Sequence, residues 1–337
     1  MTAPPPRPPT IRDVAALAGV SKSLVSLVLR DAPSVSPAKR EAVREAMQQL
    51  GYRPNLTARQ LTERRTRTIG VLLNDLRNPW FVDGLATATA VLRAEGYRLL
   101  LADGQLDADA TEDVLSGFAD LRVDGVLLLG TLADTPATLE TARSLPTVAV
   151  GNRDLGSPVL DVVAGDDVHG TRLAVDHLVQ LGHRRIGHVA GSLGKVAALR
   201  HQAFLERTAE SGIEGSVATG EMTEQGGRAA GLELLRSSTP TAVVAVNDIA
   251  AVGVLSAARE LGLHVPQDLS LVGYDNSALA RLEHLSLTSV ENDLPAIGEL
   301  AARALLDRID DPARPAATHL TVPHLVVRGT SAPPPRG

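Results

Sequence analysis

The short motifs that could support catalysis in this 337-residue chain are all incomplete. Ser36 and Lys39 have the Ser-x-x-Lys spacing of some acyl-enzymes, but the other motifs of that chemistry are missing, and Ser followed by Pro37 is typical of a helix start. Residues 191–196, Gly-Ser-Leu-Gly-Lys-Val, differ from a phosphate-binding loop in their glycine spacing and in having Val196 instead of Ser or Thr. The sequence therefore predicts no catalytic residue and no enzyme.

Metal and cofactor chemistry has equally little support. The chain contains no Cys, which excludes disulfides, thiolate zinc sites, iron–sulfur clusters and a Cys nucleophile. Neither His-Glu-x-x-His nor Gly-x-Gly-x-x-Gly occurs. His177, His183 and His188 lie in a stretch with the pattern of a helix followed by a strand, where a structural role is favoured. We expect no metal site and no cofactor.

Charge is divided unevenly between the N-terminal segment and the rest of the chain. Residues 1–68 contain 12 Lys or Arg and 5 Asp or Glu, so they carry +7, and the remaining residues carry −13 of the total of −6. A basic segment on an acidic body is typical of a protein that meets a polyanion through one end. A basic tail that only aids solubility would have the same charge, so the local motif has to decide.

Residues 10–30 have the spacing of a helix-turn-helix. Thr10 and Asp13 form a capping box for a helix over about 11–18, and Ser21 caps a second helix. Small Ala15 allows the two helices to cross closely, and Gly19 supplies the tight turn between them. Together with the positive charge, this spacing favours DNA binding over an ordinary helical hairpin.

A third helix and a shorter helical segment follow. Ser36 begins a helix that runs to Leu50 and ends at Gly51. Asn55 caps a segment that ends at residue 61, and a segment this short makes only a marginal helix in water. We therefore expect this segment to need a partner in order to fold.

The order and spacing of these residues resemble the headpiece and hinge of the lactose/galactose repressor (LacI/GalR) family. The matching segments are Thr10–Ser21, Val35-Ser36, residues 51–55 (Gly-Tyr-Arg-Pro-Asn) and residues 58–61 (Ala-Arg-Gln-Leu). The resemblance implies that the second helix enters the major groove of operator DNA, and that the hinge helix folds on the operator with Leu61 wedged into the minor groove. The DNA-contacting residues that it implies are Thr10, Ser21, Lys22, Ser23, Ser26, Leu27, Arg30, Asn55, Ala58, Arg59 and Leu61.

Two positions of the second helix depart from the family pattern. Leu24 stands where Thr or another small polar residue is usual, and Leu27 stands where Arg is common. Apolar contacts to thymine methyl groups would then replace a bidentate contact to guanine. The flanking bases of the operator are therefore not predicted.

From Ile69 onward, short apolar runs alternate with helical patterns, as in parallel α/β proteins. Strands are expected at 69–73, 98–102, 125–129, 147–150, 185–190, 242–246 and 269–273. Helices of crossover length are expected at 82–95, 170–181 and 250–261. The predicted fold is an all-α helix-turn-helix head followed by two doubly wound parallel-sheet lobes, with ligands bound beyond the carboxyl ends of the strands.

The family resemblance continues through this body and covers nearly the whole chain. It is carried by residues 69–71 (Ile-Gly-Val), 78–81 (Asn-Pro-Trp-Phe), 124–126 (Asp-Gly-Val), 182–186 (Gly-His-Arg-Arg-Ile), Gly191, 247–248 (Asn-Asp) and 272–275 (Val-Gly-Tyr-Asp). It implies a body like a periplasmic sugar-binding protein, with a small-molecule effector between the lobes, in a homodimer. The effector-binding residues that it implies are Asn74, Trp80, Phe81, Arg200, Met222, Asn247 and Asp275.

The residue types at this implied site suit a polar ligand. Arg, Asp and Asn offer the donors and acceptors that a polyhydroxylated effector requires, although a salt bridge of Arg200 and Asp275 that only links the lobes is the alternative. The adjacent Trp80 and Phe81 favour stacking against a sugar or a base, unless one of them is core. Met222 stands where an aromatic residue is common, and Gly151-Asn152 stand where an acidic residue is common, so the identity of the effector stays open.

The expected domain boundaries follow from these motifs. They are a disordered arm at 1–9, a helix-turn-helix domain at 10–54, a hinge helix and linker at 55–68, an effector-binding and dimerisation core at 69–330, and a disordered tail at 331–337. Within the core, lobe 1 is expected at about 69–164 and 294–318, and lobe 2 at about 165–290 and 319–330.

These motifs predict a ligand-responsive repressor of carbohydrate uptake or catabolism genes that binds a pseudo-palindromic operator. A corepressor-dependent regulator with a non-sugar effector such as a purine is the main alternative. A solute-binding protein would need neither the basic head nor the hinge, and an enzyme fused to such a head would need a catalytic motif. No apolar run is long enough to span a membrane and no secretory signal is present, so we expect a cytoplasmic protein that lies at the nucleoid when bound to DNA.

Overall fold

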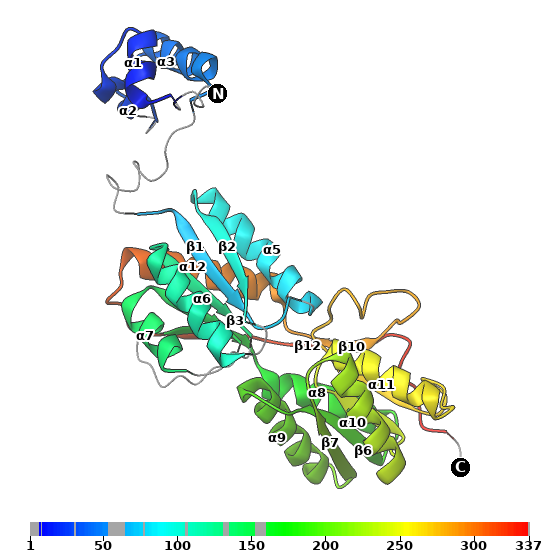
Figure 1. Cartoon of the computed structure of the whole chain (residues 1–337). Coiled ribbons are helices and arrows are strands. Elements are labelled where there is room, and N and C mark those ends of the chain that lie inside the picture. The colour runs from blue at the N-terminus through cyan, green and yellow to red at the C-terminus, as the bar shows by residue number, and fades with distance from the viewer. Residues whose placement is uncertain are drawn as a thin grey trace, which may run out of the picture. The chain divides into compact units, whose positions relative to one another are not determined.

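The computed structural model describes residues 7, 9–29, 32–52, 65–76, 78–104, 107–130, 135–151 and 160–335. They fall into two compact units, one within residues 1–66 and one within residues 67–337 (Figure 1). Nearly all of the expected arm at 1–9 and the whole expected hinge helix at 55–61 lie outside the described residues.

The first unit consists of three helices around a small apolar core. The helices are α1 (Ile11–Leu17), α2 (Lys22–Leu29) and α3 (Pro37–Leu50). Val14, Val25 and Val43, one from each helix, are fully buried in this core. The side chains that predicted the helices therefore also hold them together, because each helix places its apolar stripe toward the other two.

Local signals in the sequence set the ends of these helices. The carboxylate of Asp13 accepts hydrogen bonds of 2.7 Å from both the backbone N–H and the hydroxyl of Thr10 at the start of α1. The hydroxyl of Ser21 accepts the N–H of Leu24 at 3.2 Å at the start of α2. Gly51 ends α3 in the left-handed region with φ of 61°, where a side chain would cause strain.

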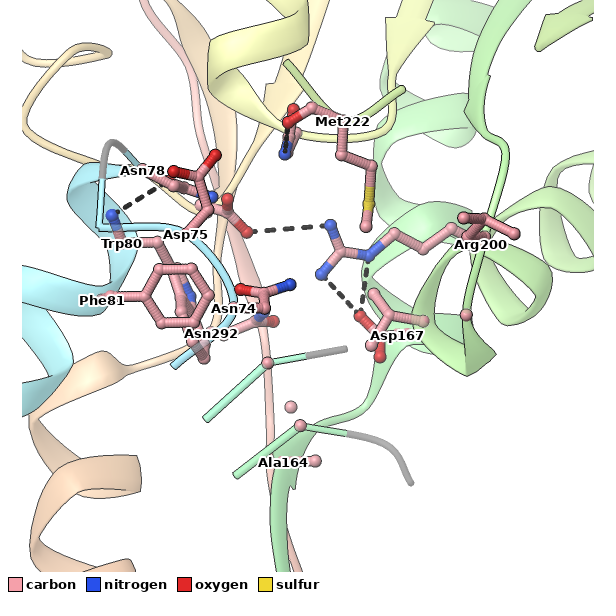
Figure 2. A pocket seen from close by; sticks show the side chains of 18 of the residues that line it. Asn74, Asp75, Asn78, Trp80, Phe81, Ala164, Asp167, Arg200, Met222 and Asn292 are labelled. Carbon is pink, nitrogen blue, oxygen red and sulfur yellow. Dashed lines mark hydrogen bonds and ion pairs between the residues drawn. The ribbon is translucent and has the colours of Figure 1, made fainter. Parts of the chain in front are cut away.

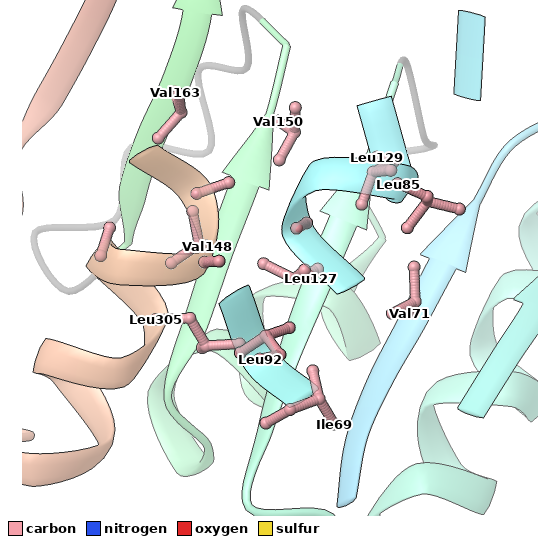
Figure 3. Packing of buried hydrophobic residues seen from close by; sticks show 14 of the residues in the cluster. Ile69, Val71, Leu85, Leu92, Leu127, Leu129, Val148, Val150, Val163 and Leu305 are labelled. Carbon is pink, nitrogen blue, oxygen red and sulfur yellow. The ribbon is translucent and has the colours of Figure 1, made fainter. Parts of the chain in front are cut away.

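Lobe 1 of the second unit is a six-stranded parallel sheet in the order β11-β5-β4-β3-β1-β2. Its strands are β1 (Thr68–Leu73), β2 (Arg98–Asp103), β3 (Gly125–Leu129), β4 (Thr147–Val150), β5 (Asp161–Gly165) and β11 (Thr318–Thr321). Helices α5 (Pro79–Ala94) and α12 (Leu294–Asp310) pack on one face, and α6 (Ala108–Asp120) on the other, while α7 (Pro136–Ser144) follows β3. Figure 3 shows Leu85 and Leu92 of α5 and Leu305 of α12 directed at the valines and leucines of the central strands.

Lobe 2 is a second six-stranded sheet, in the order β12-β10-β9-β8-β6-β7, in which only the β10–β12 pair is antiparallel. Its strands are β6 (Arg185–Gly191), β7 (Glu214–Gly220), β8 (Ala242–Ala245), β9 (Ser270–Tyr274), β10 (Thr288–Glu291) and β12 (His324–Val326). Helices α8 (Asp167–Gln180) and α9 (Lys195–Glu210) cover one face, and α10 (Glu224–Ser237) and α11 (Asp248–Glu260) cover the other.

The described chain passes between the lobes at three places, namely residues 165–167, 291–294 and 321–324. The last passage differs from the expected lobe boundary at 318. Because β11 pairs with β5, residues 319–321 belong to lobe 1 rather than to lobe 2. Within the described residues, none of the helices is long and apolar enough to cross a membrane.

The expected disordered tail at 331–337 is wrong for residues 331–335, which pack on lobe 2. The hydroxyl of Ser331 lies 2.9 Å from Nε2 of His177. Ala332 donates its N–H to Ser270 at 3.0 Å, and its carbonyl oxygen lies 2.9 Å from Nε2 of His183. Proline prevents a helix here but permits an extended segment, whose backbone groups bond to side chains of the lobe.

Candidate functional site

A cavity of about 520 Å³ lies between the two lobes of the second unit (Figure 2). Its walls come from the carboxyl ends of strands in both sheets and from the starts of the helices that follow, as expected for doubly wound sheets. All seven residues that the sequence assigned to effector binding line this cavity: Asn74, Trp80, Phe81, Arg200, Met222, Asn247 and Asp275.

Arg200 of α9 is the central charged group of the cavity. It is buried, and its Nε and Nη2 atoms each lie 2.8 Å from Oδ1 of Asp167, the first residue of α8. Nη1 donates to the carbonyl oxygen of Val246 at 2.5 Å, and the guanidinium lies 3.5 Å from the centre of the Tyr274 ring. These contacts fix the guanidinium plane, so that Arg200 presents a preset set of N–H donors to the cavity.

Asp275 stands directly after β9 with its Oδ1 atom 3.7 Å from Nη1 of Arg200. Burial raises the pKa of Asp275 well above its usual range, against the opposing charge of Arg200. Arg200, Asp167 and Asp275 all belong to lobe 2. The alternative in which Arg200 and Asp275 only link the lobes therefore does not describe this pair.

Asn247 and Met222 border the cavity from lobe 2. The side-chain oxygen of Asn247 accepts the N–H of Ala250 at 2.9 Å and so caps α11, while its Nδ2 atom lies 3.4 Å from the carbonyl oxygen of Met222. Both the oxygen and the nitrogen of the Asn247 side-chain amide thus have protein partners. Its presence in the wall is explained by helix capping as well as by any ligand contact.

Trp80 and Phe81 approach the cavity from lobe 1, at the start of α5. Their rings meet edge to face, with centroids 5.0 Å apart and planes at 89°. Phe81 is buried and belongs to the core of lobe 1, whereas Trp80 is half-buried. The expectation that one of the pair is core therefore fits Phe81, although its ring also borders the cavity.

Sequence reasoning missed several residues of the cavity wall. They are Asp75, Asn78, Asp167, Glu221 and Asn292, together with Ser192, Leu193 and Gly194. A usable signal existed for most of them, because they directly follow the ends of strands. Asn78 also caps α5, since its side-chain oxygen accepts the N–H of Trp80 at 3.0 Å. Residues 191–196, whose spacing differs from that of a phosphate loop, contain the end of β6 and the start of α9, and Ser192, Leu193, Gly194 and Val196 border the cavity.

Most of the expected DNA-recognition residues that the structure describes lie in α2 or directly before it. Ser21, Lys22 and Ser23 are exposed, and Ser26 is half-buried. Leu27 is half-buried and packs against the core of the first unit. Thr10 is half-buried at the start of α1, whereas Arg30, Asn55, Ala58, Arg59 and Leu61 lie outside the described residues.

Two family models match the chain. One described as "Bacterial regulatory proteins, lacI family" matches residues 10–55, and one described as "Periplasmic binding protein-like domain" matches residues 175–331. The expected fold, a helix-turn-helix head followed by two parallel-sheet lobes, is confirmed by these matches and by the two sheets described above.

Individual relatives align along nearly the whole chain. The HTH-type transcriptional repressor PurR of Photorhabdus laumondii subsp. laumondii is 34% identical over 328 residues, which cover 95% of this chain and 96% of the relative. A structure of the transcriptional regulator CelR in complex with cellobiose has 34% identity and a TM-score of 0.72, and the match covers 96% of this chain and 99% of that one. The Lac repressor dimer bound to operator and the anti-inducer ONPF has 28% identity and a TM-score of 0.85, and the match covers 97% of this chain and 100% of that one. These relatives are transcriptional regulators and not enzymes.

Proposed function

The chain belongs to the LacI family of bacterial regulatory proteins, and from this premise we propose that it represses carbohydrate uptake or catabolism genes in response to a small-molecule effector. The observation that carries the proposal is the presence, in one chain, of a helix-turn-helix unit and of a cavity between two α/β lobes that has charged and amide side chains in its wall. The first supplies a surface for operator DNA, and the second supplies a site whose ligand can change the relative orientation of the two lobes.

The DNA-binding part of the proposal rests on the exposed start of α2. Lys22 and Ser23 offer a charged donor and a hydroxyl donor in the first turn of α2, whose apolar side is buried in the core of the unit. The Lac repressor relative binds its operator as a dimer. A homodimer with two such units would bind a pseudo-palindromic operator, since each half-site would meet one copy of α2.

The effector part of the proposal rests on the cavity wall. Arg200, Asp275 and the asparagines beside them supply both donors and acceptors, which a polyhydroxylated ligand needs. CelR, a relative of similar length, binds cellobiose in its solved complex. A sugar is therefore favoured over a purine corepressor, because an aromatic sandwich for a flat base would need a ring where Met222 stands.

The coupling between the two parts would run through the orientation of the lobes. An effector held by residues of both lobes shifts the equilibrium between two relative orientations of the lobes. The size of the shift equals the difference between its binding free energies for the two orientations. In a dimer this change would separate the two hinge segments at residues 55–61, which lie outside the described residues. Each short hinge helix would then lose its partner and unfold, so operator affinity would fall.

The test is operator selection followed by a sugar screen. Purified full-length protein is mixed with genomic fragments that include its own promoter region at near-physiological salt, and the bound fragments are sequenced. Enrichment of a palindrome, and its release by a sugar, is the expected result. Binding that depends on salt but not on sequence would refute a specific repressor, because phosphate contacts alone carry no sequence information.

A further inference from the structure

We propose that Asp248, a buried residue of α11, is a positioning residue for the effector site, because it holds the bend of the chain that carries Asp275. The bend consists of residues 275–277 and directly follows β9. The inference rests on the proposed function in one respect, namely that Asp275 contacts the effector. It goes further because Asp248 is not among the described residues that line the cavity.

The backbone of the bend adopts a conformation that its own residues disfavour. Asp275 has φ of 108° and Asn276 has φ of 46°, and positive values of this kind are costly for residues other than Gly. Such conformations persist only where surrounding groups hold them. Because the side chain of Asp275 leaves the chain at this point, the groups that hold the bend also set the direction of its carboxyl group relative to Arg200.

Asp248 holds the bend through both oxygens of its carboxyl group. Oδ2 accepts the backbone N–H of Ser277 at 2.7 Å and the hydroxyl of the same residue at 2.9 Å. Oδ1 accepts the hydroxyl of Ser289 in β10 at 2.6 Å, and the Ser289 oxygen in turn accepts the backbone N–H of Asn276 at 3.0 Å. Two consecutive N–H groups of the bend thus depend on Asp248, one directly and one through Ser289.

The surroundings of Asp248 suit this role. Burial raises the pKa of its carboxyl group to about 6, against the hydrogen bonds from Ser289 and Ser277. At pH 7.5 the group is therefore mostly ionised and accepts from each of these donors. A side chain at Gly273 of β9 would collide with Oδ1 of Asp248, so the glycine leaves the room that the carboxylate occupies next to the bend.

An acid in the first turn of a helix could also be present only to stabilise that helix. Asp248 is the first residue of α11, where the helix dipole favours a carboxylate even on an exposed surface. Its side chain is 1% exposed, however, and the hydrogen bonds that its carboxylate accepts come from Ser277 and Ser289. The N–H of Ala250 in α11 bonds to Asn247 instead. Stabilisation of the helix alone therefore does not account for the burial of this acid.

The side chain of Asn276 is held by a separate set of contacts. Its Nδ2 atom donates to Glu291 at 2.6 Å, and its Oδ1 atom accepts from Arg328 at 2.6 Å. These contacts fix the amide group of the side chain but not the backbone N–H groups of residues 276 and 277. Substitution of Ser289 or Asp248 therefore changes the support of the backbone and keeps both partners of the Asn276 side chain.

Hydrogen exchange of the full-length protein without ligand, resolved to single amides by mass spectrometry, tests whether Asp248 holds the bend. Ser289→Ala removes the acceptor of Asn276, so its amide is expected to exchange about 5- to 10-fold faster at pH 7.5. Asp248→Asn keeps the shape but has one acceptor oxygen for donors that two oxygens served. We expect the amide of Asn276, of Ser277 or of both to exchange about 5- to 10-fold faster in this variant.

Ser270→Ala is the matched control for these variants. It removes another buried hydroxyl of lobe 2, which donates to the carbonyl oxygen of Ala332 and accepts the N–H of the same residue. Ser270 begins β9, whereas the bend follows the end of that strand. The amides of residues 276 and 277 should therefore change by less than about twofold in the control. Exchange that is unchanged at the bend, or that rises evenly through lobe 2, would overturn the proposal.

Sugar affinity tests whether the bend sets the direction of Asp275. Glucose, galactose, ribose and cellobiose are titrated by calorimetry into the parent and the three variants. For a sugar that binds the parent, we expect the affinity to fall by at least about fivefold in Asp248→Asn and in Ser289→Ala, because a preset group of the site is lost. The fall in Ser270→Ala should be less than about twofold. An affinity that is unchanged in both Asp248→Asn and Ser289→Ala would overturn the positioning role.

Failure of this inference is distinguishable from failure of the proposed function. A sugar that binds the parent and both bend variants equally would refute the positioning role and leave the effector site in place. If none of the four sugars binds the parent, the result counts against the proposed sugar effector. Exchange at residues 276 and 277, which needs no ligand, would then still decide whether Asp248 holds the bend.

Discussion

Arg281, in the connection between β9 and β10, donates a hydrogen bond of 2.7 Å to Asp83 of α5, and this ion pair joins the two lobes at their surface. The two side chains are 51% and 33% exposed, so water screens the attraction. A double-mutant cycle with Arg281→Gln and Asp83→Asn should give a coupling free energy below about 1 kcal/mol that declines as salt is added. Urea denaturation measures it. A coupling above about 2 kcal/mol that persists in high salt would show that the pair holds the lobes more firmly than an exposed pair can.

The buried partner of Arg200 should be far more important for stability. Asp167→Asn leaves the guanidinium buried without its closest carboxylate, and we expect the free energy of unfolding to fall by about 3 to 5 kcal/mol. Asp166→Asn is the matched control, because Asn replaces Asp well as the cap of α8 and should change stability by less than about 0.5 kcal/mol. Equal losses in the two variants would contradict the assignment of the burial cost to Asp167.

A buried histidine should make lobe 2 sensitive to acid. Burial lowers the pKa of His188 from 6.5 to about 4, so the folded state binds fewer protons than the unfolded state between these values. The stability contributed by neutral His188 is therefore complete above about pH 6.5 and is lost as the pH falls toward 4. The free energy of unfolding, measured by urea titration between pH 4 and 7, should decline less steeply in His188→Asn than in the parent. His284→Gln changes an exposed histidine and should keep the parental slope.

Lys22 at the exposed start of α2 should contact a phosphate. Lys22→Ala should weaken binding to operator and to random duplex by similar factors, and should lower the slope of log affinity against log salt by about 1. Fluorescence anisotropy over a salt series gives both quantities. Arg259→Ala removes the same charge from lobe 2 and should leave the slope unchanged. A loss confined to the operator would instead assign Lys22 to a base contact.

Leu61 lies outside the described residues, and its role as a minor-groove wedge stays a prediction from the sequence. Leu61→Ala should lower operator affinity by tenfold or more, because the insertion that bends the duplex is lost, and should leave binding to random DNA nearly unchanged. Leu121→Ala, which shortens an exposed leucine of lobe 1, controls for the loss of apolar volume. Full operator affinity in Leu61→Ala would refute the hinge mechanism as well.

The elements that the sequence predicted well are those in which several local signals agree. The end of α3 combines a long amphipathic pattern with Gly51, and its start combines Ser36 with Pro37, so its observed bounds match the expected ones. The buried runs at β3 and β4 were also placed correctly, because both faces of a central parallel strand are apolar.

Three of the strands that were missed, β7, β11 and β12, lack such signals. β7 lies at an edge of its sheet and reads Glu-Gly-Ser-Val-Ala-Thr-Gly, with two glycines and little apolar character. β11 and β12 have four and three residues, and their pairing partners are distant in the chain. Pairing of this kind depends on tertiary structure, which no local pattern encodes.

The cavity residues that match positions of the family motif were predicted, and those that do not match it were missed. Arg200 and Asp275 were found because they match positions of the family motif. Asp167 and Asn292 were missed because their only local signal was a position just after a strand, and that position does not identify their side chains as partners of Arg200 or of a ligand. Asn292 lies on one of the passages between the lobes, so its surroundings are set by residues far away in the sequence.

The discontinuous assembly of the lobes has a consequence for synthesis on the ribosome. Lobe 1 lacks α12 and β11 until residues 294–321 have been made, and the packed segment at 331–335 reaches lobe 2 last of all. The three helices of the first unit need no residue beyond 52 for their core. The head can therefore fold early in translation, while the body stays incomplete until residues 294–335 have been made, so a product truncated before them would keep the head without a complete body to regulate it.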